Sequence, residues 1–342
     1  MANGACSTRT RSTSDRSGVI SRDDPAVRWC FVTRFVGVDL GATTLSVVVA
    51  DDTGTVLGRL DSTTPTAADA SGLRDALFES IATACERGDV DPRAVRAIGI
   101  ASVGPIDGSA IRDPVNLPNV DRFEVVGPVA ERFDCDARLV NDATAGAIAE
   151  AAASGDDHMV YLTLSTGVGA GVVAGGRPLF GHRSNAGEVG HLTLDPTAEV
   201  LCGCGATGHW EAFSGGANLV AHARSIVADG VETGIDLESA EPADLLETVG
   251  TDPLATRLAD RVATWNAIGV SSVVHAYDPA RIVVGGGVAL NHPETVVDPI
   301  RTRLPDHCLD GAPPVALPQF GADAPVRGAL EMVSRKSGDR NR

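Results

Sequence analysis

The chain has 342 residues and a mass of 35.1 kDa, and it is 43% hydrophobic and 21% charged. These values exclude a disordered or fibrous chain and are typical of one large domain or two ordinary ones. The formal net charge of −17, from 28 basic and 45 acidic residues, excludes a general basic surface for nucleic acid. No apolar run reaches the roughly 20 residues of a membrane span, so no membrane partner is expected.

The first 34 residues are rich in Ser, Thr and Arg and show no apolar periodicity. We predict a disordered extension over residues 1–34, because the segment is too short and aperiodic for a winged-helix domain and lacks the apolar centre of a secretory signal. The seven cysteines are scattered apart from Cys202 and Cys204, which is not the pattern of a disulfide framework. A cytoplasmic location is therefore expected.

From residue 35 onward, apolar strands alternate with helical patterns. Three strands followed by a helix and a strand occur twice, which predicts two α/β domains with a cleft between them. Strands are expected at 34–40, 45–50, 56–60, 95–101, 138–141, 159–164, 168–173 and 281–284, and helices at 67–87, 143–153, 216–229, 253–276, from about 293, and 324–335.

Two turns combine glycine with small hydroxyl residues. Residues 39–44 read Asp-Leu-Gly-Ala-Thr-Thr, and residues 165–169 read Ser-Thr-Gly-Val-Gly. Such turns let backbone N–H groups and hydroxyls approach a phosphate, and Asp39 can hold Mg²⁺ through water. Each alone also fits an ordinary glycine hairpin. One in each half of the chain indicates a cleft that binds the phosphates of a nucleotide from both sides.

Asn141 and Asp142 stand where a strand passes into a helix. Both residue types favour the N-cap position, which is one interpretation. A carboxylate at this place can also orient and deprotonate a hydroxyl nucleophile.

Thiol and imidazole side chains gather between residues 191 and 209. His191, Cys202, Cys204 and His209 suit a tetrahedral Zn²⁺ site, although the Cys-x-Cys spacing is tighter than in common zinc fingers. The alternative is two buried cysteines near surface histidines.

A glycine run, Gly285 to Gly287, follows a predicted strand. It can bring the backbone against adenine or ribose, or form a plain strand-to-helix turn. The chain has no Walker A sequence and no Gly-x-Ser-x-Gly elbow.

The order of these motifs resembles the ROK family of repressors, open reading frames and sugar kinases. The resemblance spans residues 35–335 and is most specific in Glu188-Val-Gly-His191, which is followed by Cys202-Gly-Cys204-Gly-Ala-Thr-Gly208. It implies the actin-like ATPase (ribonuclease H-like) fold, with a small domain (35–140, completed by a C-terminal helix, 321–336) and a large domain (141–320) that carries the zinc segment 191–209.

The resemblance also assigns roles to individual residues. Asp142 matches the catalytic base, and the sugar contacts match Gly104, Asn116, Asn141, Asp142, Glu188, His191 and Glu211. The cofactors implied are ATP, Mg²⁺ and a structural Zn²⁺ on His191, Cys202, Cys204 and His209. The ATP contacts match Asp39, Gly41, Thr43, Thr44, Ser165, Thr166, Gly167, Gly285, Gly286 and Gly287.

Two positions depart from the family pattern. Thr44 replaces the usual Lys of the first phosphate turn and so removes a positive charge near the phosphates. His209 replaces the usual fourth Cys, which leaves a chemically complete Cys₂His₂ set.

An ATP-dependent hexose kinase acting on glucose is the function that the resemblance favours. Fructose, mannose, N-acetylglucosamine or N-acetylmannosamine as substrate, and polyphosphate as donor, remain open alternatives. A sugar-sensing repressor of the same fold is disfavoured by the short N-terminal segment and the acidic charge. The resemblance also favours a homo-oligomer, either a dimer or a tetramer.

The basic residues comprise 27 Arg and one Lys, Lys336. A GC-rich genome would explain this ratio, but together with the charge of −17 it resembles the proteins of halophilic archaea. We predict that folding stability and activity rise with KCl into the molar range, because salt screens the repulsion among the acidic groups. Thermal melts followed by circular dichroism check this, and a highest midpoint below about 0.2 M salt, where the Debye length is ~7 Å or more, contradicts it.

Overall fold

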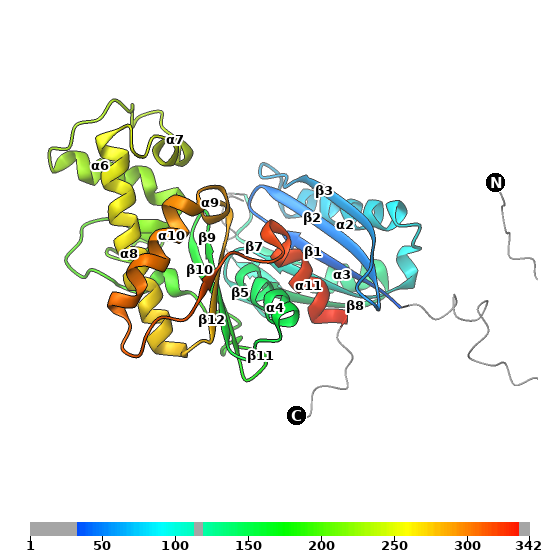
Figure 1. Cartoon of the computed structure of the whole chain (residues 1–342). Helices are drawn as coiled ribbons and strands as arrows, with labels where there is room; N and C mark the ends of the chain where they lie inside the picture. Colours follow the sequence, from blue (N-terminus) through cyan, green and yellow to red (C-terminus); the bar gives the residue numbers. More distant parts are fainter. Residues whose placement is uncertain (1–32, 113–118, 335–342) are drawn as a thin grey trace, which may run out of the picture.

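A computed structural model describes residues 33–112 and 119–334 (Figure 1). The predicted disordered extension, residues 1–34, lies outside the described residues except at its last two positions. Asn116 and the end of the predicted helix 321–336 also lie outside them. Within the described ranges, no helix combines the length and the apolar character that a membrane crossing requires.

The first sheet has five strands in the order β3-β2-β1-β4-β8. The strands β1, β2 and β3 pair antiparallel, whereas β4 pairs parallel with both β1 and β8. Strands β1 and β4 are buried for most of their length, which explains why they read as continuous apolar runs. The strands span Arg34–Leu40 (β1), Thr44–Asp51 (β2), Val56–Thr63 (β3), Val95–Ser102 (β4) and Asp136–Asn141 (β8).

The second sheet repeats this plan in the order β11-β10-β9-β12-β13. Strands β9 and β10 form an antiparallel hairpin, and β12 pairs parallel with β9 and β13. The strands span Met159–Leu164 (β9), Val168–Ala174 (β10), Arg177–Pro178 (β11), Arg281–Gly285 (β12) and Val315–Ala316 (β13).

Helices α4 (Asp142–Ser154) and α11 (Ala324–Ser334) lie between the two sheets (Figure 1). A Cβ atom on Gly328 of α11 would lie 1.7 Å from the carbonyl oxygen of Ala145 of α4, so the two helices touch backbone to backbone. The same kind of contact seats α11 on the first sheet at Gly99 and α4 on the second sheet at Gly171. The layers therefore run first sheet, α11, α4, second sheet, and glycine makes each contact possible.

The remaining elements cover the outer faces. Helix α2 packs on β2 and β3, α3 packs on β8, and α8 packs against α5, α6 and α10. A small third sheet, β5-β6-β7, follows β4. The bounds are Ala70–Arg87 (α2), Val126–Phe133 (α3), Trp210–Ser214 (α5), Leu219–Ala228 (α6), Pro242–Glu247 (α7), Pro253–Tyr277 (α8), Gly287–Asn291 (α9), Pro293–Arg303 (α10), Ile106–Asp107 (β5), Ala110–Arg112 (β6) and Arg122–Glu124 (β7).

The predicted strands and long helices are confirmed, with ends that shift by up to three residues. The exception is the helix expected at 216–229, of which residues 216–218 form a short 3₁₀ turn before α6. The elements that the sequence analysis did not predict are mostly short, such as β5, β11, α5 and α9, because two to five residues carry too little periodicity. The division into domains at residues 140 and 141 stays a prediction.

Candidate active site

The second phosphate turn and the glycine run lie side by side. Strand β12 pairs with β9 so that Gly285 stands opposite Thr163. A Cβ atom on Gly287 would lie only 3.6 Å from the Oγ atom of Ser165. The residues expected to bind phosphate and adenosine, which are about 120 positions apart in the chain, therefore meet at one end of the second sheet.

Each phosphate turn is closed by its own backbone. The N–H group of Gly41 donates to the carbonyl oxygen of Thr44 (3.0 Å), and the N–H group of Ser165 donates to that of Gly167 (3.0 Å). Thr43 and Thr44 are exposed, so their side chains remain accessible to a ligand. Thr166 is exposed in the same way in the second turn.

The glycine run has a packing explanation of its own. A Cβ atom on Gly285 would lie 2.1 Å from the hydroxyl oxygen of Tyr161, and one on Gly286 would lie 2.5 Å from the carbonyl oxygen of Leu164. Gly286 also has a φ angle of +88°, where side chains are strained. Both glycines are thus required by the fold itself, whether or not a nucleotide contacts them.

The sequence left open whether Asn141 and Asp142 cap a helix or serve as a catalytic base, and the structure distinguishes the two residues. Asn141 is the N-cap of α4, because its Oδ1 atom accepts hydrogen bonds from the N–H groups of Ala143 (2.9 Å) and Thr144 (3.2 Å). Asp142 is the first residue of the helix, and its Oδ1 atom accepts from the adjacent N–H group of Ala143 (2.8 Å). Hydrogen bonds from its own N–H group and from the Asn141 side chain also lower its pKa. The capping interpretation is therefore correct for Asn141, and the Asp142 carboxylate is left available for other chemistry.

Burial and mutual repulsion raise the pKa of two carboxyl groups at this place. Loss of hydration, followed by repulsion from Asp142 and then from Asp323, raises the pKa of Asp39 to about 8. Loss of hydration is also the main cause that raises the pKa of Asp142 to about 6, and Glu188 adds repulsion. Both pKa values exceed the usual 3.8, so the folded state favours the protonated form of each group. Their contribution to stability is therefore complete below about pH 4. It is lost as the pH rises through about 6 for Asp142 and about 8 for Asp39.

Glu188 is the N-cap of a short 3₁₀ turn, and His191 is its last residue. The Oε2 atom of Glu188 is 3.8 Å from the Nε2 atom of His191, and the two side chains are 41% and 36% exposed. Partial loss of hydration raises the pKa of Glu188, whereas His191 acts in the opposite direction. Both side chains are open enough to reach a ligand.

Glu211 connects the second phosphate turn with the cysteine cluster. Its Oε2 atom accepts a hydrogen bond from the N–H group of Val168 (2.9 Å), and its Oε1 atom accepts one from the thiol of Cys202 (3.4 Å). A Cβ atom on Gly167 would lie 2.4 Å from the same carboxylate, which explains the glycine there. In this structure the Glu211 carboxylate therefore forms hydrogen bonds with the protein. The family resemblance predicted a sugar contact for Glu211 and did not predict these bonds.

The four expected metal ligands do come together. The ligand atoms of His191, Cys202, Cys204 and His209 all lie within 4.8 Å of one another. The Sγ–Nδ1 distances are 3.7 Å for Cys202 and His191 and 3.3 Å for Cys204 and His209. In a tetrahedral zinc site with usual bond lengths, such atoms stand about 3.6 Å apart. The set therefore fits Zn²⁺ in composition and spacing.

Of the other expected sugar contacts, Gly104 lies just after β4 with a φ angle of +92°, and Asn116 lies outside the described residues. Tyr161 was not among the residues predicted from the sequence. Tyr161 is buried, and its ring would contact a Cβ atom on Gly146 of α4, so it stands between the helix of Asp142 and the Gly285 turn. Its one sequence signal was its rarity, since the chain has two tyrosines.

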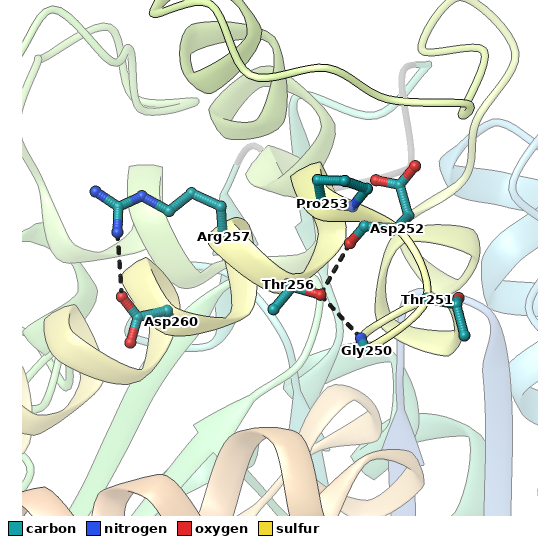
Figure 2. Close-up of a pocket in the computed structure, with 7 residues that line it drawn as sticks. All are labelled: Gly250, Thr251, Asp252, Pro253, Thr256, Arg257 and Asp260. Atoms are coloured by element: carbon teal, nitrogen blue, oxygen red, sulfur yellow. Dashed lines mark hydrogen bonds and ion pairs between the residues drawn. The ribbon is translucent and has the colours of Figure 1, made fainter.

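A hollow of about 580 Å³ lies at the start of α8, and Figure 2 shows the residues that line it. Its polar groups bond to one another: the hydroxyl of Thr256 donates to the carbonyl oxygen of Asp252 (2.8 Å) and accepts from the N–H group of Gly250 (2.9 Å). The carboxylate of Asp252 caps α8. These interactions stabilise the helix end, and none of the residues expected to bind sugar or ATP contributes to the lining, which consists of Gly250, Thr251, Asp252, Pro253, Thr256, Arg257 and Asp260.

Two repeated sheets joined by crossing helices, with hydroxyl-rich turns and carboxylates at their ends, define a protein of the actin-like ATPase fold. The chain belongs to the ROK family, whose model matches residues 35–336.

Three known proteins illustrate the similarity. A glucokinase from Pyrobaculum calidifontis is 31% identical over 88% of this chain and 95% of the relative. An N-acetylmannosamine kinase from Escherichia coli O139:H28 is 34% identical over 75% of this chain and 83% of the relative. The crystal structure of a ROK glucokinase from Streptomyces griseus in complex with glucose and AMPPNP has a TM-score of 0.70 and 29% identity, and the match covers 88% of this chain and 98% of that one.

Proposed function

We propose that the protein is an ATP-dependent hexose kinase that converts glucose and ATP to glucose 6-phosphate and ADP, with Asp142 as the general base. Membership of the ROK family and similarity to glucokinases support the reaction class. The observation that carries the mechanism is the division of roles at α4. Asn141 caps the helix, so the carboxylate of Asp142 is not needed as the cap, and its pKa of about 6 is close to neutral pH.

In this mechanism the Asp142 carboxylate accepts the proton of the sugar hydroxyl. The hydroxyl oxygen forms a bond to the γ-phosphorus of ATP, and the bond from that phosphorus to the β–γ bridging oxygen breaks, which releases ADP. Negative charge spreads over the γ-phosphate oxygens during the transfer. The hydroxyls of residues 43, 44, 165 and 166, and the backbone N–H groups of residues 42, 43, 166 and 167, would donate to those oxygens. Thr44 supplies a hydroxyl where the family usually has a Lys charge.

Asp39 would hold Mg²⁺ through water when ATP is bound, and the ion would neutralise phosphate charge. The residues fit such an ion: repulsion from Asp142 and Asp323 contributes to the raised pKa of Asp39, and a nearby cation relieves repulsion of this kind. The adenosine would lie along Gly285 to Gly287, next to Ser165.

The cluster of His191, Cys202, Cys204 and His209 would hold one structural Zn²⁺. Four protein ligands leave no open position for a reacting water, so the ion would stabilise the loop rather than act in catalysis. It would fix His191 beside Glu188. Glu188, His191, Glu211, Asn141 and Gly104 would then contact the sugar.

The similarity to an N-acetylmannosamine kinase makes that sugar the second candidate substrate. A coupled assay of ADP release across glucose, fructose, mannose, N-acetylglucosamine and N-acetylmannosamine, with ATP or polyphosphate as donor, tests the proposal. We expect the highest kcat/KM for glucose with ATP. A preference for another sugar would reassign the substrate, and no transfer to any sugar would reject the kinase function.

Replacing Asp142 by Asn tests the general base. Asn keeps the size of the side chain but cannot accept the proton, so we expect kcat to fall by ~10²–10⁴, or about 3–5 kcal/mol of barrier. In the parent protein the carboxylate must be deprotonated, so kcat should decrease as the pH falls through about 6, and the variant should lack this step. A variant within threefold of the parent rate, with an unchanged melting temperature, would remove the assignment.

Replacing Cys204 by Ser tests the zinc site. We expect the parent protein to contain one zinc per chain and the variant to lose it, with weaker sugar binding because His191 is no longer held. Cys308→Ser, at a half-buried thiol outside the cluster, is the matched control and should keep its zinc. Elemental analysis of protein purified without chelators is the measurement, and a parent protein free of zinc contradicts the prediction.

A further inference from the structure

Asn185 connects two segments that lie in different predicted domains. Its Oδ1 atom accepts a hydrogen bond from the N–H group of Ile106 (2.9 Å), and its Nδ2 atom donates to the carbonyl oxygen of the same residue (3.1 Å). The amide thus pairs with both backbone groups of Ile106, as a neighbouring strand would. Both bonds are partly buried and join positions 79 residues apart.

Both ends of this contact are rigidly held. On one side, residues on either side of Asn185 bond to β10, through the N–H group of Leu179 to Val172 O (2.8 Å) and the N–H group of Ala170 to Gly187 O (2.8 Å). A Cβ atom on Gly187 would lie 1.8 Å from the carbonyl oxygen of Ala170, so the loop lies directly on the strand. The Asn185 amide is therefore presented by an anchored loop rather than by a free one.

On the other side, Ile106 is 1% exposed and lies in β5, where it pairs with Ile111 of β6. The carbonyl oxygen of Pro105 also accepts from the N–H group of Arg112 (2.9 Å). Backbone hydrogen bonds hold both sides, and the two Asn185 hydrogen bonds join the loops at a fixed spacing in this structure.

The position of the contact in the sequence indicates what it controls. Ile106 follows Gly104 by two residues, and Asn185 precedes Glu188 by three. These are the segments from the two predicted domains that would face each other across the sugar. We propose that Asn185 is a positioning residue that holds the two sides of the sugar site together before sugar binds. This inference rests on the proposed hexose kinase function.

The physical reason is preorganisation. A sugar that must first bring two protein segments together binds more weakly, because part of its binding free energy is used to order them. A contact between the segments that already exists removes this cost. The expected ATP contacts lie elsewhere, at residues 39–44, 165–167 and 285–287. Loss of the Asn185 contact should therefore weaken sugar binding far more than ATP binding.

Two variants of Asn185 separate its hydrogen bonds from its volume. Asn185→Ala removes both bonds. Asn185→Asp keeps the shape but places an oxygen against the carbonyl oxygen of Ile106 and adds a negative charge, so the Ala variant carries the test and the Asp variant should be at least as harmful. Asn119→Ala is the matched control, because the Nδ2 atom of Asn119 donates to the carbonyl oxygen of Ala67 (3.1 Å), within the predicted small domain.

We expect the dissociation constant of glucose, measured by calorimetry, to rise about tenfold in both Asn185 variants, the size of effect that one or two hydrogen bonds produce. The KM for ATP should stay within about twofold, and the control should match the parent in both. Glucose affinity within twofold of the parent in both Asn185 variants, or an equal loss in Asn119→Ala, overturns the proposal.

A second measurement does not depend on sugar at all. Hydrogen–deuterium exchange at the Ile106 amide should be faster in Asn185→Ala than in the parent or in Asn119→Ala. Unchanged exchange there rejects the contact as a structural link. If the parent protein binds no hexose, the proposed kinase function fails, and the exchange result still decides whether Asn185 holds the two segments together.

Discussion

The close contact between α4 and α11 is the constraint on which the rest of the structure depends. Gly328 allows the backbone of α11 to reach Ala145, and Gly171 and Gly99 seat the pair on the two sheets. Glycine and alanine lose little side-chain entropy when they are buried, so such an interface forms without large interlocking side chains. Because Asp142 is the first residue of α4, this contact also determines where the candidate base stands relative to both sheets.

Around helix α4, neighbouring carboxyl groups lose hydration and repel one another. Burial raises the pKa of Asp39 and Asp142, and partial loss of hydration raises the pKa of the half-exposed Glu188. Groups that only stabilised the fold would be paired instead, as Arg59 is with Asp61 and Asp323. Carboxylates left without a cation are typical of sites that receive one together with a charged ligand. A nucleotide with its Mg²⁺ is such a ligand.

The Cys/His cluster and the second glycine–hydroxyl turn, residues 165–169, are connected, although they are separate motifs in the sequence. Glu211 bonds both to the Cys202 thiol and to the backbone beside the second phosphate turn. Tyr161 makes a comparable link between α4 and the Gly285 turn, with its ring against Gly146. Residues expected to bind sugar, phosphate and adenosine are thus held in place by common neighbours rather than independently.

The sequence by itself determined the strands and long helices, the two glycine–hydroxyl turns and the composition of the Cys/His cluster. These features depend on local periodicity, turn chemistry and residue type, which neighbouring positions carry together. Only the tertiary structure decided that Asn141 rather than Asp142 caps α4, that Gly285 is required by Tyr161, and that Asn185 meets Ile106. Such contacts join residues far apart in the chain, and burial, which raises the pKa of Asp142, exists only once the layers have packed.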